Sequence, residues 1–154
     1  MSDNKILSTP KKERVVLQSI VFLLDECINA FDALKELEGL RLKIGKMKIE
    51  ERDSLILPAM TIHKLCGITR DQFCIRIANL FDKRKDVHSL KKYFKGNIID
   101  TLEGHAVTKA SIKARHSNIA HLSKAYVKWP EIDVILKSNI IEILETIQLG
   151  IIII

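Results

Sequence analysis

The sequence contains few residues that interrupt a helix, few aromatic side chains and no long, unbroken apolar stretch. Only six glycines and three prolines occur in 154 residues, and aromatic residues make up 5% of the chain. So few breaks favour long regular segments, and so few aromatics argue against a platform on which single-stranded bases stack. The longest apolar stretch, Val15 to Leu24, is interrupted by Gln18 and Ser19. It is shorter than the roughly 20 residues that cross a bilayer, so we expect no membrane span and no membrane partner.

Cysteine is also scarce, and its pattern excludes the usual disulfide and zinc frameworks. Cys27, Cys66 and Cys74 are odd in number, form no C-x-x-C pair and lie within apolar helical patterns. We expect them to be buried small hydrophobic residues. His63 lies three residues before Cys66, but no second ligand pair of suitable spacing accompanies it, so we expect no metal. The G-x-x-x-x-G-K-[ST], G-x-G-x-x-G and H-E-x-x-H motifs are missing too, and we expect no cofactor.

The composition that remains is typical of a soluble, single-domain protein. Hydrophobic residues make up 47% and charged residues 29% of the chain, a mixture that is too apolar for disorder. The length fits one domain over residues 1–154. The amino terminus shows no apolar run ahead of a cleavage site, which indicates a cytoplasmic protein. The 25 Lys and Arg exceed the 19 Asp and Glu, and the net charge of +6 favours an anionic partner.

Apolar residues recur at spacings of three and four, which predicts an all-α fold. The first helix is expected to begin with Thr9 as N-cap and Pro10 at its first position, and to end at Gly39. We expect it to be the central helix. Residues 40–49 fit a small hairpin, a twisted connection or a frayed helix end. The expected buried stripe of the first helix is Leu17, Ile20, Leu24, Cys27, Phe31 and Leu34.

A second helix is expected through residues 55–65, kinked or begun near Pro58 and ending at Gly67. A third begins at Thr69, which forms a capping box with Gln72.

The carboxyl-terminal half of the chain predicts three more helical segments after a charged turn at residues 82–86. A short helix follows Ser89, and a longer one begins within residues 101–104 and lasts to about Tyr126. Trp129-Pro130 then breaks the chain, because proline cannot continue a helix. The last helix is strongly amphipathic and runs to Gly150.

One segment carries most of the excess positive charge. The 27 residues between Glu103 and Glu131 contain no Asp or Glu, but hold three of the five histidines. A solvated basic helix face explains the charge alone equally well. The histidines favour an anion site, because their protonation changes near neutral pH. The basic residues of this segment are Lys109, Lys113, Arg115, Lys124 and Lys128.

Arg115, Asn118 and His121 follow one another at intervals of three within this segment. On an α-helix each lies about 60° from the next, and Arg115 and His121 are separated by about 9 Å along the axis. A long arginine side chain covers such a rise, so its guanidinium and the imidazole can converge on one phosphate with Asn118 between them. Ser117 lies one turn before His121, within reach of a ring nitrogen.

Two stretches of the sequence resemble the HEPN domain superfamily. The segment ARHSNIAHLSK fits the R-x(4–6)-H motif and resembles the RNxxxAH helix end of these domains. Residues 75–94, IRIANLFDKRKDVHSLKKYF, resemble the LFD…SL passage of the AbiU-type abortive-infection branch. One departure is His116, directly after Arg115, where many relatives carry Asn.

The resemblance implies an up-and-down antiparallel bundle of about five helices that pairs as a twofold homodimer, with two motifs around one cleft. Many members are metal-independent endoribonucleases, and others only bind nucleic acid or nucleotides. Carried over to this sequence, Arg115 and His121 take the catalytic places, with His116, Ser117 and Asn118 as supporting polar groups. One imidazole would remove the proton of the RNA 2′-OH, the arginine would stabilise charge on phosphorus, and the partner's imidazole would protonate the leaving oxygen.

These arguments predict an RNA-cleaving toxin or phage-defence effector, for which an antitoxin protein would be a further partner. The lysines of the acid-free segment, Lys109, Lys113, Lys124 and Lys128, are expected to contact the RNA backbone. The alternative is a catalytically inactive helical module that binds nucleic acid or a partner protein, in which Arg115 and His121 hold the dimer together. The basic residues 83–85 fit an extension of the RNA track or, more simply, a solvated loop.

Overall fold

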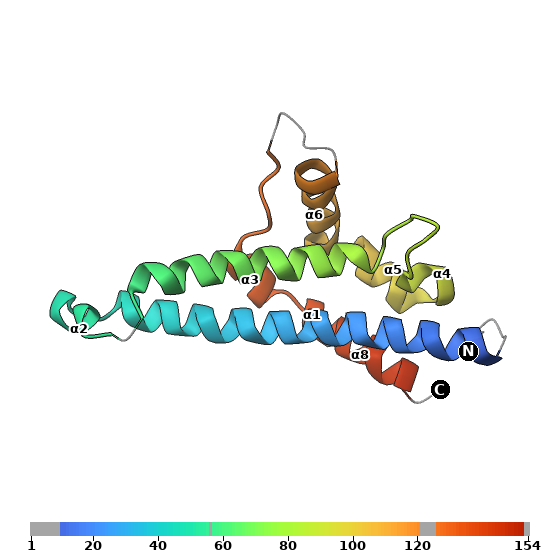
Figure 1. Cartoon of the computed structure of the whole chain (residues 1–154), viewed down its shortest axis with the longest axis horizontal. Helices are drawn as coiled ribbons and strands as arrows, with labels where there is room; N and C mark the ends of the chain where they lie inside the picture. The colour runs from blue at the N-terminus through green and yellow to red at the C-terminus, as the bar shows by residue number, and fades with distance from the viewer. Residues whose placement is uncertain (1–9, 56, 121–125, 153–154) are drawn as a thin grey trace.

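The computed structural model describes residues 10–55, 57–120 and 126–152. Within these ranges the chain is a bundle of α-helices with one short π-helix and no strand. Two long antiparallel helices, α1 (Pro10–Gly45) and α3 (Ala59–Asn79), lie side by side along the molecule (Figure 1). The all-α fold that the helical period predicts is therefore confirmed.

Helix α1 is the central element, as its wide apolar stripe predicts. It begins at Pro10, contains 36 residues and is therefore about 54 Å long; Thr9 lies outside the described residues. It packs against α3 on one side and against α8 (Ile140–Ile152) on another. The ring of Phe31 meets that of Phe73 on α3 edge to face, with centroids 5.9 Å apart. The buried residues of its stripe are Ile20, Leu24, Cys27, Phe31 and Leu34, with Leu17 packed against them.

Two glycines that predict helix ends lie inside helices instead. Helix α1 continues through Gly39 and ends at Gly45, so residues 40–45 form no hairpin. Helix α3 likewise continues through Gly67, and Thr69 is an interior residue rather than an N-cap. The reason is packing, because these parts of the two helices bury a second apolar cluster of Ile44, Ile62 and Cys66. That burial offsets the roughly 1 kcal/mol that an interior glycine costs a helix.

A one-and-a-half-turn helix, α2 (Ile49–Asp53), connects the two long helices. Its first turn is closed by the backbone N–H of Lys48, which donates to the Glu51 carboxylate at 2.9 Å.

The carboxyl-terminal half is more divided than the sequence predicts. Helix α4 (Leu90–Tyr93) follows Ser89 as expected, but α5 (Asn97–Gly104) begins earlier than residues 101–104. His105 then separates α5 from α6 (Ala106–Arg115), and the chain continues as a π-helix, His116–Ala120. The single helix predicted to reach Tyr126 is therefore wrong, because His105 ends one helix and caps the next. Its imidazole accepts a hydrogen bond from the backbone N–H of Val107 at 3.2 Å.

The predicted break at Trp129-Pro130 is confirmed, and the Trp129 side chain is buried in the main core. The last helix is interrupted at Ser138 and Asn139, which divide it into α7 (Ile132–Lys137) and α8.

The three cysteines are buried, as expected for small hydrophobic residues. Burial raises the pKa of the Cys27 thiol, and it raises the pKa of Cys74 to about 11. Both thiols are therefore neutral at pH 7. Among the described segments, none of the helices has both the length and the apolar character that a membrane crossing requires.

Candidate functional site

Helix α6 carries Arg115 to one end of α3. Figure 1 shows α6 rising away from the α1–α3 pair, and its buried face packs against α3. Its first turn is fixed by the His105 cap, and the other nitrogen of that ring lies 3.2 Å from the side-chain oxygen of Asn139. Arg115 is the last residue of α6, and its side chain is 24% exposed. The buried face of α6 consists of Val107, Thr108, Ser111 and Ala114.

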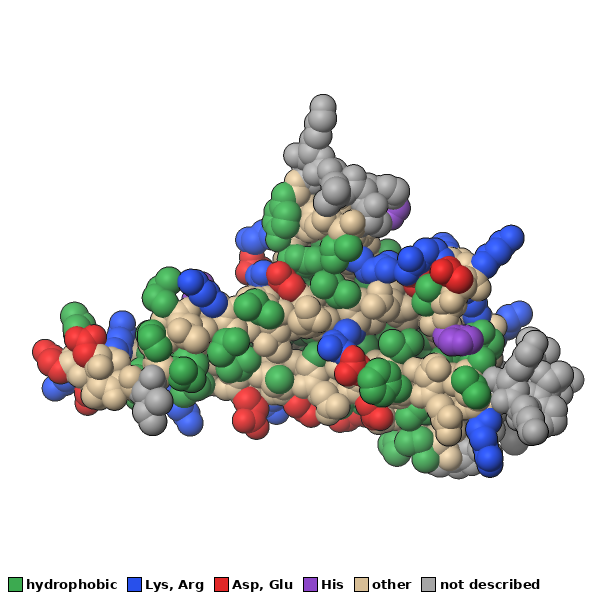
Figure 2. Space-filling model, viewed as in Figure 1, with side chains coloured by type: hydrophobic (Ala, Val, Ile, Leu, Met, Phe, Trp, Pro, Cys, Tyr) green, Lys and Arg blue, Asp and Glu red, His purple; other side chains and the backbone are tan. Residues whose placement is uncertain are grey.

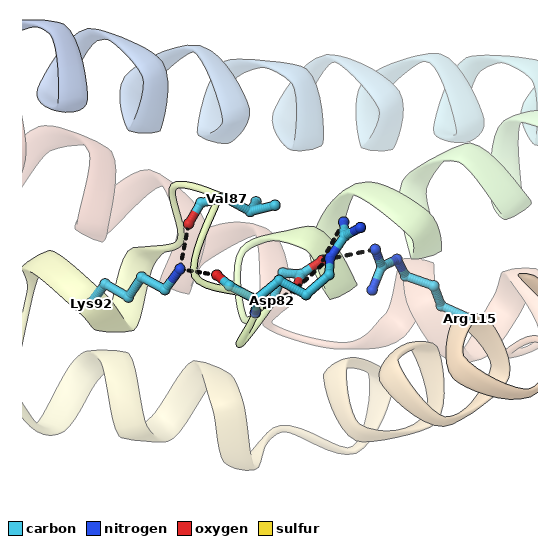
Figure 3. A network of polar contacts seen from close by, with 5 residues as sticks. Asp82, Val87, Lys92 and Arg115 are labelled. Carbon is cyan, nitrogen blue, oxygen red and sulfur yellow. Dashed lines mark hydrogen bonds and ion pairs between the residues drawn. The ribbon is translucent and has the colours of Figure 1, made fainter. Parts of the chain in front are cut away.

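The Arg115 guanidinium is held by a carboxylate from a distant part of the sequence. Its Nη2 donates to Oδ2 of Asp82 at 2.9 Å (Figure 3). Asp82 lies three residues after the end of α3, and only 6% of the residue is exposed. A buried carboxylate is stable only where cations or hydrogen-bond donors surround it. This contact therefore fixes the position of Arg115 as well as satisfying Asp82.

Asp82 also binds Arg84, two residues further along the same loop. The Arg84 side chain donates Nε to both carboxylate oxygens, at 3.2 and 3.1 Å, and Nη2 to Oδ2 at 2.9 Å. The backbone N–H of Arg84 donates to Oδ1 at 3.0 Å. These bonds to Arg84, together with the bond and charge of Arg115, lower the pKa of Asp82 to about 2, although burial acts against them. Asp82 is therefore ionised throughout the neutral range.

The loop from Asp82 to Ser89 is closed on itself by a lysine of α4. Lys92 donates its ammonium group to the backbone carbonyls of Arg84 and, at 2.5 Å, of Val87 (Figure 3). The backbone N–H of Leu90 donates to the carbonyl of Leu80 at 2.8 Å, which joins the two ends of the loop. Basic side chains gather on the surface over this loop, at the base of α6 (Figure 2).

The Asn118 side chain binds the backbone of Val127, a contact that the sequence does not reveal. Its amide nitrogen donates to the carbonyl of Val127 at 2.6 Å, and its amide oxygen accepts from the N–H of Val127 at 2.8 Å. This pair ties the π-helix to residues 126–130, where Trp129 enters the core. The amide of Asn118 is therefore engaged with the backbone, whereas the sequence places it between Arg115 and His121.

The helical geometry used to relate Arg115 to His121 ends at Arg115. Residues His116–Ala120 form a π-helix, whose hydrogen bonds span five residues instead of four. The α-helical rotation and rise assumed from the spacing therefore do not apply beyond Arg115. His121 and Lys124 lie outside the described residues.

The remaining predicted site residues that the structure describes differ in position and in exposure. Lys109 and Lys113 are exposed on α6, but on an α-helix Lys113 lies about 160° from Arg115. Lys128 is exposed and forms an ion pair with Glu131. His116 is exposed, and Ser117 is half-buried.

The sequence predicts a charged turn at residues 82–86 and places residues 83–85 in the RNA track or in a solvated loop, but it does not show that Asp82 binds both Arg84 and Arg115. The available signal was the position of Asp82 directly after Leu80 and Phe81, which continue the buried stripe of α3. A carboxylate at the end of such a stripe is placed to become buried. Its partner Arg115 lies 33 residues away, which no local spacing can reveal.

No described group of three or more His, Cys, Asp or Glu residues is arranged to hold a metal ion. Comparisons of the chain with family models, with curated proteins and with solved structures found no match. The contacts around Asp82 are therefore the basis on which a function can be inferred.

Proposed function

We propose that this protein is a metal-independent endoribonuclease of HEPN type that acts on RNA as a homodimer. The observation that carries the proposal is the Asp82–Arg115 contact, with 2.9 Å between Nη2 and Oδ2. It holds a guanidinium in a defined position on a basic surface, and a fixed guanidinium suits the planar, paired recognition of a phosphate.

A contact between the two stretches that resemble HEPN domains, residues 75–94 and 114–124, supports this proposal. In the passage LFD…SL the five named residues, Leu80, Phe81, Asp82, Ser89 and Leu90, are all buried. Its Asp82 bonds to Arg115, the first residue of the R-x(4–6)-H motif. The two stretches that resemble HEPN domains thus contact one another, although neither spacing nor helical period required it.

The proposed reaction uses the 2′-OH of the substrate as nucleophile. The imidazole of His121 takes the 2′-OH proton, and the oxygen attacks the adjacent phosphorus. Arg115 stabilises the negative charge that develops on the phosphate oxygens. The bond from phosphorus to the 5′ oxygen then breaks, and the partner's imidazole protonates that oxygen. The products are a 2′,3′-cyclic phosphate and a 5′-OH end.

The biological setting that fits this reaction is a cytoplasmic toxin or phage-defence effector. Uncontrolled cleavage of cellular RNA would harm the host cell, so an antitoxin protein is the partner expected to restrain it. The homodimer supplies the two imidazoles that the reaction needs, one for each proton transfer.

Cleavage of RNA in the presence of EDTA tests the proposal. Wild type, Arg115→Ala and His121→Ala are incubated with RNA, with Lys64→Ala as control, because Lys64 is exposed on α3 outside the site. We expect wild type and Lys64→Ala to cleave, and the other two variants to lose at least about 100-fold in rate. Intact RNA with wild type, or equal cleavage by all four proteins, would overturn the enzyme assignment.

The same contacts also favour a second function, that of a catalytically inactive module that binds nucleic acid or a partner protein. Asp82 pairs with Arg115 within one chain, and Asn118 is engaged with Val127. Both residues then stabilise the fold, and RNA or protein binds the surrounding basic surface. In the assay above, this module binds RNA and leaves it uncut.

A further inference from the structure

Arg84 is the second arginine on Asp82, and it lies outside the R-x(4–6)-H motif. Its guanidinium contacts both oxygens of the carboxylate, yet its side chain remains 64% exposed. An exposed arginine is normally solvated and mobile. Here three hydrogen bonds to a buried acid orient it.

The guanidinium groups of Arg84 and Arg115 converge on a single atom. Oδ2 of Asp82 accepts from Nη2 of Arg84 and from Nη2 of Arg115, each at 2.9 Å. One guanidinium arrives from the loop after α3 and the other from the end of α6 (Figure 3). Asp82 balances one of the two cations, and Asp86, in the same loop, also interacts with the charge of Arg84. Each arginine has five N–H donors and commits only some of them to Asp82.

The backbone that carries Arg84 is fixed from both sides. Asp82 accepts from its N–H at 3.0 Å, and Lys92 donates to its carbonyl. Lys92 also holds the carbonyl of Val87 at 2.5 Å, which closes the loop. A ligand that binds Arg84 therefore meets a side chain whose position is already set, and less conformational entropy is lost on binding.

We propose that Arg84 and Arg115 together bind a phosphodiester group of single-stranded RNA, with Asp82 and Lys92 as positioning residues. The proposal deepens the proposed function and rests on it for the identity of the ligand. Lys83 and Lys85 are exposed on either side of Arg84. Such a continuous run of positive charge suits a chain of phosphates better than a single free phosphate ion.

Binding of a labelled single-stranded 2′-O-methyl RNA, followed by fluorescence anisotropy, tests this inference. The methyl group removes the nucleophile, so binding is measured without cleavage. Arg84→Ala is compared with Lys85→Ala, which removes the same charge from the same loop. We expect Arg84→Ala to raise Kd about tenfold and to reduce the salt dependence of log K by about 0.7. Lys85→Ala is expected to raise Kd less than about threefold.

Arg84→Lys keeps a cation beside Asp82 and separates loss of the guanidinium from loss of the fold. We expect it to raise Kd about threefold to tenfold while its circular dichroism stays that of wild type, because an ammonium lacks the paired donors of a guanidinium. If Arg84→Ala does not fold, the test rests on the Kd of Arg84→Lys compared with the Kd of Lys85→Ala. Inorganic phosphate at millimolar concentration is added as competitor and is expected to leave the RNA bound.

Equal effects of the Arg84 and Lys85 variants, or displacement of the RNA by inorganic phosphate, would overturn the two-arginine site. Failure of wild type to bind the RNA would overturn it as well. Arg84-dependent binding by a protein that leaves ordinary RNA uncut would overturn only the proposed catalysis, so the two failures are distinguishable.

Discussion

Asp82 is the residue on which the candidate site depends. A carboxylate that is 6% exposed would be strongly destabilising alone, and here two arginines and a backbone N–H satisfy it. The same contacts set the positions of both guanidinium groups. Asp82 therefore contributes to stability and to the electrostatics of the surface through one set of bonds.

Asp82→Asn tests this account through the pH dependence of stability. Because the pKa of Asp82 is lowered from 3.8 to about 2 in the folded protein, its contribution is present at pH values above 4. It is lost as the pH falls toward 2. We expect Asp82→Asn to lower the free energy of unfolding by about 2 kcal/mol at pH 7.

Urea unfolding followed by circular dichroism at pH 7 and pH 3 measures this difference. The gap between wild type and Asp82→Asn should narrow at the lower pH. Asp133→Asn is the control, because that side chain is 64% exposed and its contact with Lys137 is long, at 3.6 Å. An Asp82→Asn effect that is the same at both pH values would contradict the account.

Asn118 makes a second prediction at this scale. Asn118→Ala removes two hydrogen bonds to Val127 and leaves that backbone pair without its partners. We expect a loss of about 1–3 kcal/mol in the free energy of unfolding. Lys113→Ala, exposed on the preceding helix, should change it by less than about 0.5 kcal/mol. Equal unfolding midpoints for the two variants in urea would show that the Asn118 bonds do not stabilise the fold.

At the scale of elements, the sequence predicts helices well and their ends poorly. The short helix after Ser89 and the break at Trp129-Pro130 are both confirmed. The helix ends predicted at Gly39 and Gly67 are wrong, because packing between α1 and α3 outweighs local propensity. The division at His105 was missed because a histidine is not among the usual N-cap residues.

Two glycine substitutions test the backbone conformation at Gly39, inside α1, and at Gly96, before α5. A Cβ added at Gly39 meets no atom within 4 Å, so Gly39→Ala should raise the free energy of unfolding by about 0.5–1 kcal/mol. Gly96 has φ 155° and ψ 161°, a conformation that essentially only glycine adopts. Gly96→Ala should therefore destabilise by about 1–3 kcal/mol. Thermal or urea unfolding of both variants checks whether the free energy of unfolding rises for Gly39→Ala and falls for Gly96→Ala. Destabilisation by Gly39→Ala would argue for a helix end at that residue.

At the scale of the whole molecule, the fold brings Asp82, in the loop after α3, to Arg115 at the carboxyl-terminal end of α6. The sequence predicts Arg115 as a site residue, but its partner and its neighbours depend on how α6 crosses α3. Lys113 lies on another side of α6 from Arg115, whereas Arg84 joins Arg115 at Asp82 from another part of the chain. Charge counted along the sequence therefore indicates an anion site without locating it.

The proposed homodimer makes a prediction about mass. Light scattering after size exclusion should give twice the 17.6 kDa of the chain. Ile119 lies within the motif and is 50% exposed, so we expect Ile119→Asp to shift the mass toward that of one chain. Val134→Asp is the control, because Val134 is equally exposed on α7. A wild-type mass of one chain at micromolar concentration would contradict the dimer.

The central claim is that the 2′-OH of RNA attacks a phosphate held by Arg115. It is tested most directly by mass spectrometry of the products from an RNA with one preferred cleavage position, alongside the same RNA carrying a 2′-deoxy nucleotide on the 5′ side of that bond. The account predicts a 2′,3′-cyclic phosphate and a 5′-OH from the first, and no cleavage at that bond in the second. A 5′-phosphate product, or cleavage of the 2′-deoxy bond at an equal rate, would contradict it.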